Sequence, residues 1–129
     1  MYGAQIGAYQ NVQVATADPA STILLLYDGA LRFLRQALQG LEQKDAAQFA
    51  SSLSRAHAII GELSDSLDHE VGGAIADNLA GLYTFVLGHL TQGLIAKSAG
   101  HLEDVLEILQ TLRDGFEGAA QAHREGSGG

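Results

Sequence analysis

The stretch TADPASTILLLYDGALRFLRQALQGL, from Thr16 to Leu41, decides the fold. Asp18 is a typical helix N-cap, and Pro19 suits the first helical position because the N–H it lacks has no partner within the helix there. Apolar side chains then recur at alternating steps of three and four, the spacing of a helix packed against other helices; they are Leu24, Tyr27, Leu31, Leu34, Leu38 and Leu41.

A second apolar row lies beside the first and consists of Leu26, Ala30, Phe33 and Ala37. At about 100° per residue, the two rows together cover roughly half of the helix circumference. A surface helix needs an apolar stripe only a little wider than about 100°. We therefore expect this helix to pack inside a bundle and also to present apolar surface to a partner.

The same helical spacing recurs three more times along the chain. We predict helices over residues 19–41, 45–68, 73–97 and 100–122, with Asp45 as the N-cap of the second and Gly72-Gly73 as the break before the third. Short connections between such helices make neighbours antiparallel. The expected fold is therefore all-α, an antiparallel up-down four-helix bundle over residues 18–124.

The third helix is as broadly apolar as the first. One row holds Ile75, Leu79, Leu82 and Val86, a second holds Tyr83, Leu87, Leu90 and Leu94, and Phe85 lies outside both. Sequence alone does not separate the side chains that fill the core from those that line a groove.

The two ends of the chain differ from the bundle. Residues 1–17 read as an extended N-terminal arm that Gly3 and Gly7 keep from forming a helix. The arm is too apolar for an idle tail, so it covers either the core of the domain itself or an apolar site from which it can be displaced. Residues 125–129 have the composition of a flexible tail or a fusion remnant.

Composition excludes several classes of protein. Seven Lys and Arg against fifteen Asp and Glu give a net charge of −8, which argues against nucleic acid or anionic lipid as a partner. The longest purely apolar run, Ile23 to Tyr27, is far shorter than the ~20 residues of a membrane span, so we expect no membrane insertion. The chain has no cysteine and no visible signal peptide, which fits a cytoplasmic protein.

Catalysis finds no support in the residues. The pairs His57 with His69 and His89 with His101 are each twelve residues apart, and helical metal ligands are spaced three or four apart. We therefore expect no metal, no cofactor and no enzymatic activity. Arg32 and Arg35 lie one turn apart and could hold an anion, although a solvated face explains them more simply.

Several blocks of the sequence resemble the flagellar secretion chaperones of the FliS family. The first long block is LYDGA followed by Phe33-Leu34, and the second is LDxExGGxIAxNLxxLY, which ends at Tyr83. Shorter blocks complete a match that spans everything except the glycine-rich tail; they are Ala8–Gln10, Thr16–Pro19, Leu102–Val105 and Leu112–Asp114. The two long blocks in this order are a specific signal, and neither would be specific alone.

The resemblance implies a four-helix bundle that binds the disordered C-terminal segment of flagellin, prevents premature polymerisation and delivers flagellin to the cytoplasmic domain of the export gate. It also implies that Ile6 and Tyr9 in the arm act as a cap that moves when flagellin arrives. We expect the flagellin-binding groove to contain Tyr9, Val14, Leu24, Tyr27, Leu31, Leu82, Tyr83 and Val86.

Two other classes of protein stay open from the residues. A self-associating structural bundle would bury the same grooves against a second copy, so a homodimer in the unloaded state is one alternative. A metal-binding bundle enzyme is the other.

Overall fold

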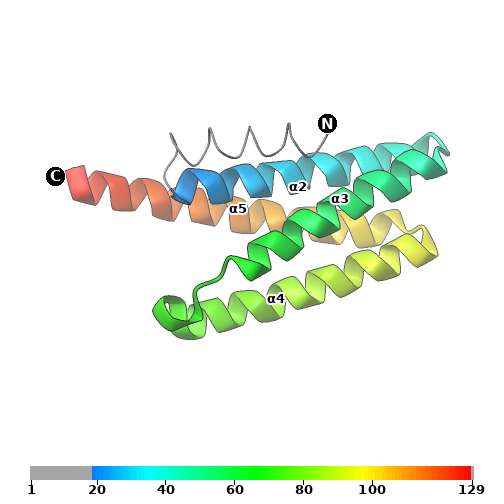
Figure 1. Cartoon of the computed structure of the whole chain (residues 1–129). Coiled ribbons are helices and arrows are strands. Elements are labelled where there is room, and N and C mark those ends of the chain that lie inside the picture. Colours follow the sequence, from blue (N-terminus) through cyan, green and yellow to red (C-terminus); the bar gives the residue numbers. More distant parts are fainter. Residues whose placement is uncertain (1–18, 129) are drawn as a thin grey trace, which may run out of the picture.

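The computed structural model describes residues 19–128, which form four helices: α2 (Pro19–Glu42), α3 (Ala46–Asp65), α4 (His69–Ala96) and α5 (Ala99–Gly128) (Figure 1). Each helix runs antiparallel to the one before it, and no strand occurs among these residues. The predicted all-α, antiparallel up-down four-helix bundle is confirmed. The predicted arm of residues 1–17 and the Asp18 cap lie outside the described part of the chain.

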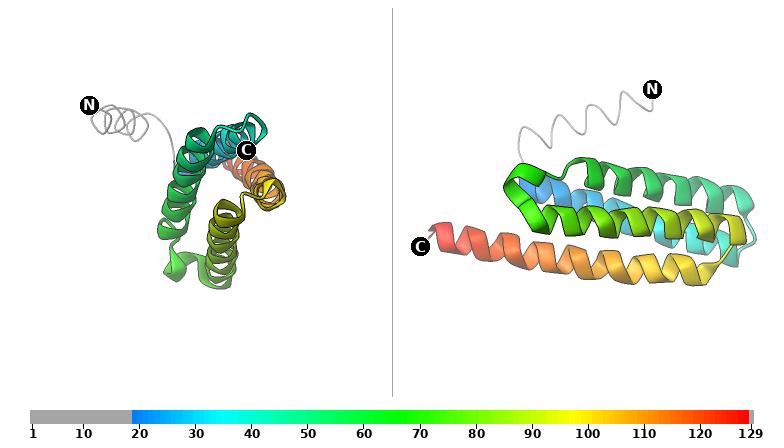
Figure 2. Two further views of the ribbon diagram at one scale, coloured as in Figure 1. Left: turned by 90° about the vertical axis from the view of Figure 1, so that its right-hand side faces the viewer. Right: turned by 90° about the horizontal axis from the view of Figure 1, so that it is seen from below.

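The four helices form a ring in which each contacts two neighbours (Figure 2). The helices α2 and α3 pack most closely, and α4 contacts only α3 and α5. The backbones of α2 and α4 therefore lie on one diagonal of the bundle. Because α3 runs obliquely from α2 at one end to α4 at the other, α4 is the helix least enclosed by its neighbours (Figure 1).

Aspartate caps set where the second and third helices begin. The side chain of Asp45 accepts a hydrogen bond from the backbone N–H of Gln48 at 3.0 Å, which confirms it as the N-cap of α3. The carboxylate of Asp68 likewise accepts from the N–H groups of Glu70 and Val71, at 3.1 Å each. Because Asp68 provides this cap, α4 begins at His69, four residues before the predicted start.

The predicted break at Gly72-Gly73 is a kink inside α4. Gly73 has φ 52° and ψ −126°, a backbone conformation that glycine adopts at little cost. The kink folds the first turn back, because His69 Nδ1 lies 2.8 Å from Asp77 Oδ1. In a straight helix, eight residues would separate the two positions by about 12 Å.

The last helix is longer than the sequence indicates. The helix α5 continues to Gly128, six residues past the predicted end, and so includes residues 125–128 of the segment predicted as a flexible tail. The run Ala119-Ala120-Gln121-Ala122 favours helix, and adding a turn to an existing helix is much easier than starting one.

One apolar core joins all four helices. Its members are almost fully buried side chains at the predicted helical spacing, and such burial supplies the main drive for folding. They are Tyr27, Ala30, Leu31, Leu34, Ala37, Phe49, Leu53, Ala56, Ile60, Leu63, Tyr83, Val86, Leu90, Leu102, Val105 and Leu109.

The helix α4 is unusually apolar. Within the described residues it is the one helix that could cross a membrane by length and composition, a weak indication because apolar bundle helices pass the same test. Only 22% of its most apolar stretch is buried in the bundle. Its apolar character therefore exceeds what the core uses.

Candidate functional site

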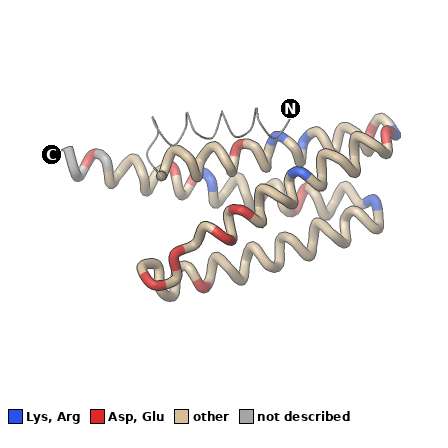
Figure 3. Tube along the Cα trace, viewed as in Figure 1, with Lys and Arg blue, Asp and Glu red and all other residues tan. Residues whose placement is uncertain are grey.

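The outer surface of α4 exposes large apolar side chains. Val71 is 85% exposed, Ile75 72%, Phe85 54% and Ile95 78%. Figure 3 shows that α4 carries almost no charge, and from Asn78 to Ala96 it contains no Lys, Arg, Asp or Glu. Exposed apolar surface of this kind marks interaction sites in soluble proteins.

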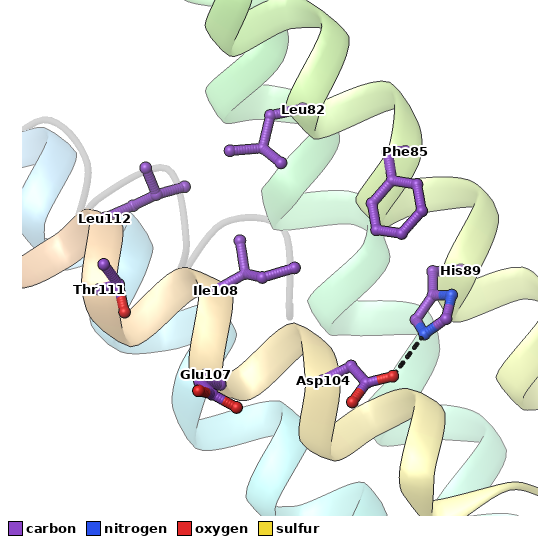
Figure 4. Close-up of a pocket in the computed structure, with 8 residues that line it drawn as sticks. All are labelled: Leu82, Phe85, His89, Asp104, Glu107, Ile108, Thr111 and Leu112. Atoms are coloured by element: carbon purple, nitrogen blue, oxygen red, sulfur yellow. Dashed lines mark hydrogen bonds and ion pairs between the residues drawn. The ribbon is translucent and has the colours of Figure 1, made fainter.

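Part of this surface borders an open, mostly apolar groove between α4 and α5, with a volume of about 510 Å³ (Figure 4). Side chains from α4 line one wall and side chains from α5 line the other. The lining residues are Leu82, Phe85, His89, Asp104, Glu107, Ile108, Thr111 and Leu112. Ile75, Leu82, Phe85 and His89 follow one another at steps of seven, three and four, so they share one face of α4.

Two rings that line the groove, Phe85 and His89, stack with a third ring, His101, outside it. The ring centroids of Phe85 and His89 are 5.2 Å apart, and those of His89 and His101 are 4.3 Å apart. His89 Nε2 donates a hydrogen bond to Asp104 Oδ2 at 3.0 Å, and His101 Nδ1 lies 2.8 Å from Ser98 Oγ. The two imidazoles pack face to face instead of converging on one point, so this arrangement is a packing contact between α4 and α5 and not a metal-ligand pair.

Gly93 allows this close approach. A Cβ at Gly93 would lie 2.9 Å from the Cβ of His101 and 3.0 Å from Leu102 Cδ1, closer than side chains normally pack. The helices α4 and α5 are therefore held together at the His101 end. Farther along, Ile75 on α4 stays largely exposed.

Polar contacts anchor the bundle behind the groove. The hydroxyl groups of Tyr27 and Tyr83 share a hydrogen bond, and Arg113 Nε donates to Asp28 Oδ1 at 2.9 Å. Burial raises the pKa of both tyrosines. The hydrogen bonds to Asp28 and Glu117 raise the pKa of Arg113, which stays charged.

The predicted groove residues fall into four groups. Leu82 lines the groove, and Leu24 is half-buried on α2. Four others belong to the core, each 3% exposed or less: Tyr27, Leu31, Tyr83 and Val86. Tyr9, Val14 and the proposed cap residue Ile6 lie outside the described residues. Core membership means that these four support the groove from behind in this conformation, and their direct contact with a ligand stays a prediction.

Most groove residues were not singled out from the sequence. Phe85 could have been recognised from the sequence as an exposed apolar residue, because it lies outside both apolar rows of a helix segment without charges. Asp104, Glu107 and Thr111 carried no such signal, because polar residues on a bundle helix usually face solvent. Only the position of α4 relative to α5 shows that they share a groove with Leu82.

Comparison with known proteins assigns the chain to a family. The family model described as flagellar protein FliS matches residues 2–123. The flagellar secretion chaperone FliS of Bacillus subtilis is 33% identical over 125 residues, covering 95% of this chain and 92% of the relative. The FliS of Salmonella typhimurium is 36% identical over 123 residues, with 91% of each chain covered.

A solved structure supports the fold. The crystal structure of a bacterial flagellar chaperone matches with a TM-score of 0.76 at 20% identity, covering 92% of this chain and 98% of the other. Together, the family match over residues 2–123 and the identity to named relatives place the chain in the FliS family of flagellar secretion chaperones.

Proposed function

We propose that this chain is a cytoplasmic, non-catalytic export chaperone that binds the disordered C-terminal segment of flagellin. In this role it masks the segment, prevents premature polymerisation and delivers flagellin to the cytoplasmic domain of the export gate. Membership of the FliS family supports the general role. The apolar surface of α4 and the adjacent groove support the mode of binding.

The exposure of Phe85 carries the proposal. An aromatic side chain that is 54% exposed lies in the segment Asn78–Ala96 of α4, which has no Lys, Arg, Asp or Glu, beside an open apolar groove. A self-contained bundle would gain by turning such a side chain inward or by replacing it with a polar one. A partner that covers Phe85 removes this apolar area from water.

A helix fits the groove better than an extended strand does. The groove walls are two helices, and all backbone N–H and C=O groups inside a helix are already paired, so no sheet edge is offered for strand addition. An amphipathic segment that folds on binding places apolar side chains from successive turns into such a groove. The cost of ordering the segment is offset by apolar burial on both partners.

In this proposal the N-terminal arm competes with flagellin for the apolar surface. Ile6 and Tyr9 would cover apolar surface in the unloaded chain and leave it when flagellin binds. Tyr9 and Val14 would then contact the ligand together with Leu24 and Leu82.

The test is calorimetric titration of the chain with the C-terminal segment of flagellin from the same genome. Phe85→Asp places a charge in the groove at a side chain that is already exposed, so the fold is retained. Thr84→Asp is the matched control, because Thr84 is also exposed on α4 and does not line the groove. We expect Phe85→Asp to weaken binding at least about tenfold, the effect of leaving a charge poorly solvated, while Thr84→Asp stays within about twofold.

The same samples test the chaperone role. The wild-type chain at equimolar concentration should block flagellin polymerisation measured by light scattering, and Phe85→Asp should not. If the flagellin segment does not bind the wild-type chain, or if both variants bind like the wild type, the proposed function or its site is wrong.

A homodimer in the unloaded state is the alternative role for the same surface. Two copies could bury Phe85 and Ile95 against each other, since both side chains are exposed. The net charge of −8 on each copy opposes this association. Light scattering at low micromolar concentration separates the readings: a stable dimer that added flagellin segment leaves unchanged would favour self-association.

A further inference from the structure

The groove between α4 and α5 is apolar on one wall and acidic along part of the other. Leu82 and Phe85 on α4 face a wall of α5 that contains Asp104 and Glu107 (Figure 4). Neither Lys nor Arg lines the groove. The charged rim of the groove therefore has a single sign.

The two carboxylates lie one turn apart on the same face of α5. Asp104 and Glu107 are three residues apart, which places them about 4.5 Å apart along the helix axis. Asp104 accepts a hydrogen bond from His89, and Glu107 makes no ion pair with any side chain that the structure describes. The α4 wall contributes His89 to Asp104 but no Lys or Arg to Glu107, since residues 78–96 contain neither.

We infer that the groove selects an amphipathic helix that has Lys or Arg along the edge of its apolar stripe, and that Glu107 is the residue that recognises these basic side chains. The inference rests on the proposed function and adds the chemistry by which the groove recognises its occupant. Apolar side chains of the bound helix pack against Leu82 and Ile108. A basic side chain beside that stripe then reaches Glu107.

Charge complementarity favours this occupant over a second copy of the chain. The acidic rim and the net charge of −8 attract a basic edge and repel an acidic one. A second copy that docked α4 on α4 would bring two acidic rims together. Rim charges of this kind contribute modestly to affinity and strongly to the choice between partners.

Three synthetic helical peptides test the inference. They share one leucine stripe and differ only at the positions on both of its edges, which are Lys, Gln or Glu, so that either orientation of the peptide offers the same charge. Binding is measured by fluorescence anisotropy with labelled peptide. We expect the Lys-edged peptide to bind about 2- to 5-fold more tightly than the Gln-edged one, and the Glu-edged one to bind weakest. At 1 M NaCl the differences should shrink, because the Debye length falls to about 3 Å.

Two variants with equal net charge separate local recognition from the overall field. Glu107→Lys changes the groove rim, whereas Glu103→Lys makes the same change at an exposed position of α5 outside the groove. We expect Glu107→Lys to reverse the order of the Lys-edged and Glu-edged peptides and Glu103→Lys to keep it. Equal effects of the two variants would overturn the inference.

The outcomes also separate this inference from the proposed function. If the three peptides bind alike while Phe85→Asp still weakens binding of the flagellin segment, charge selection is wrong and the groove function stands. If none of the peptides binds while the flagellin segment does, the inference is again overturned. Failure of the wild-type chain to bind the flagellin segment instead contradicts the proposed function.

Discussion

The hydroxyl of Tyr27 on α2 and the hydroxyl of Tyr83 on α4 share a hydrogen bond across the diagonal of the bundle. The next residue, Asp28, accepts a hydrogen bond from Arg113 on α5. Consecutive residues of the LYDGA block thus join α2 to two other sequence blocks, the one that closes with Tyr83 and the one that contains Arg113. The pattern of sequence blocks therefore reflects one set of contacts in the bundle.

The two tyrosines should be coupled, so that replacing both lowers the free energy of unfolding by less than the two single replacements added together. Tyr27→Phe or Tyr83→Phe leaves the other hydroxyl buried without its partner, so each should lower the free energy of unfolding by about 1–3 kcal/mol. The double variant removes both polar groups, and its loss of unfolding free energy should be clearly smaller than the sum of the losses in the two single variants. Urea unfolding of the four proteins measures this, and strictly additive losses would show that the hydrogen bond is unimportant.

Alkaline pH should destabilise the bundle through the same pair. Burial raises the pKa of Tyr27 and Tyr83 in the folded chain, whereas unfolded tyrosines ionise near pH 10. The folded state therefore binds these protons more tightly, and their contribution is complete below pH about 10 and declines above it. We expect the pair to steepen the loss of unfolding free energy above that point, by at most about 1.4 kcal/mol per pH unit for each tyrosine.

The double variant Tyr27→Phe/Tyr83→Phe is the control for this pH dependence, because lysines and other tyrosines titrate in the same range. Unfolding free energies at pH 8, 10 and 11 should fall less steeply in the double variant than in the wild-type chain. Parallel profiles would show that the pair does not govern alkaline stability.

The fold was predictable because its signals are local. Caps such as Asp45 and apolar side chains at steps of three and four depend on neighbours within one or two turns, and four such segments with short connections allow few arrangements. The start of α4 was misplaced because Gly72-Gly73 was taken as a break before the helix, whereas the Asp68 cap begins the helix earlier and Gly73 forms a kink inside it.

The candidate site was much less predictable. Helical spacing identified Tyr27, Leu31, Tyr83 and Val86 as important apolar positions, and they fill the core. The groove depends on how far α4 is enclosed by α3 and α5, a property of the whole bundle. No local pattern distinguishes Glu107, at the groove rim, from Glu103 outside it.

The contact at Gly93 gives a stability prediction with an internal control. Gly93→Ala puts a Cβ within 2.9 Å of His101 Cβ and should push α4 and α5 apart, at a cost of about 1–3 kcal/mol. Gly88→Ala, also in α4, meets no atom within 4 Å and should stabilise the helix by up to about 1 kcal/mol. Thermal unfolding compares the two, and equal shifts of the same sign would contradict the packing described here.

The arm should affect binding more than stability. If Ile6 and Tyr9 cover the apolar site, flagellin can bind only those molecules in which the site is open. The apparent affinity for flagellin is then reduced in proportion to the fraction of open molecules. The variant Ile6→Ala, which keeps the proposed ligand contact of Tyr9, should then bind the flagellin segment more tightly, with a melting temperature close to that of the wild type. A large loss of melting temperature without a change in binding would assign Ile6 to the core instead.

Methyl NMR of the chain labelled at Ile, Leu and Val, with and without the flagellin segment, locates the binding surface. If the exposed apolar face of α4 and its groove receive the segment, the methyl signals of Leu82, Ile108 and Leu112 shift or broaden, and that of Ile59 on α3, outside the groove, stays in place. Changes confined to α2 and α3, with the groove signals unaltered at saturating flagellin segment, would contradict this assignment.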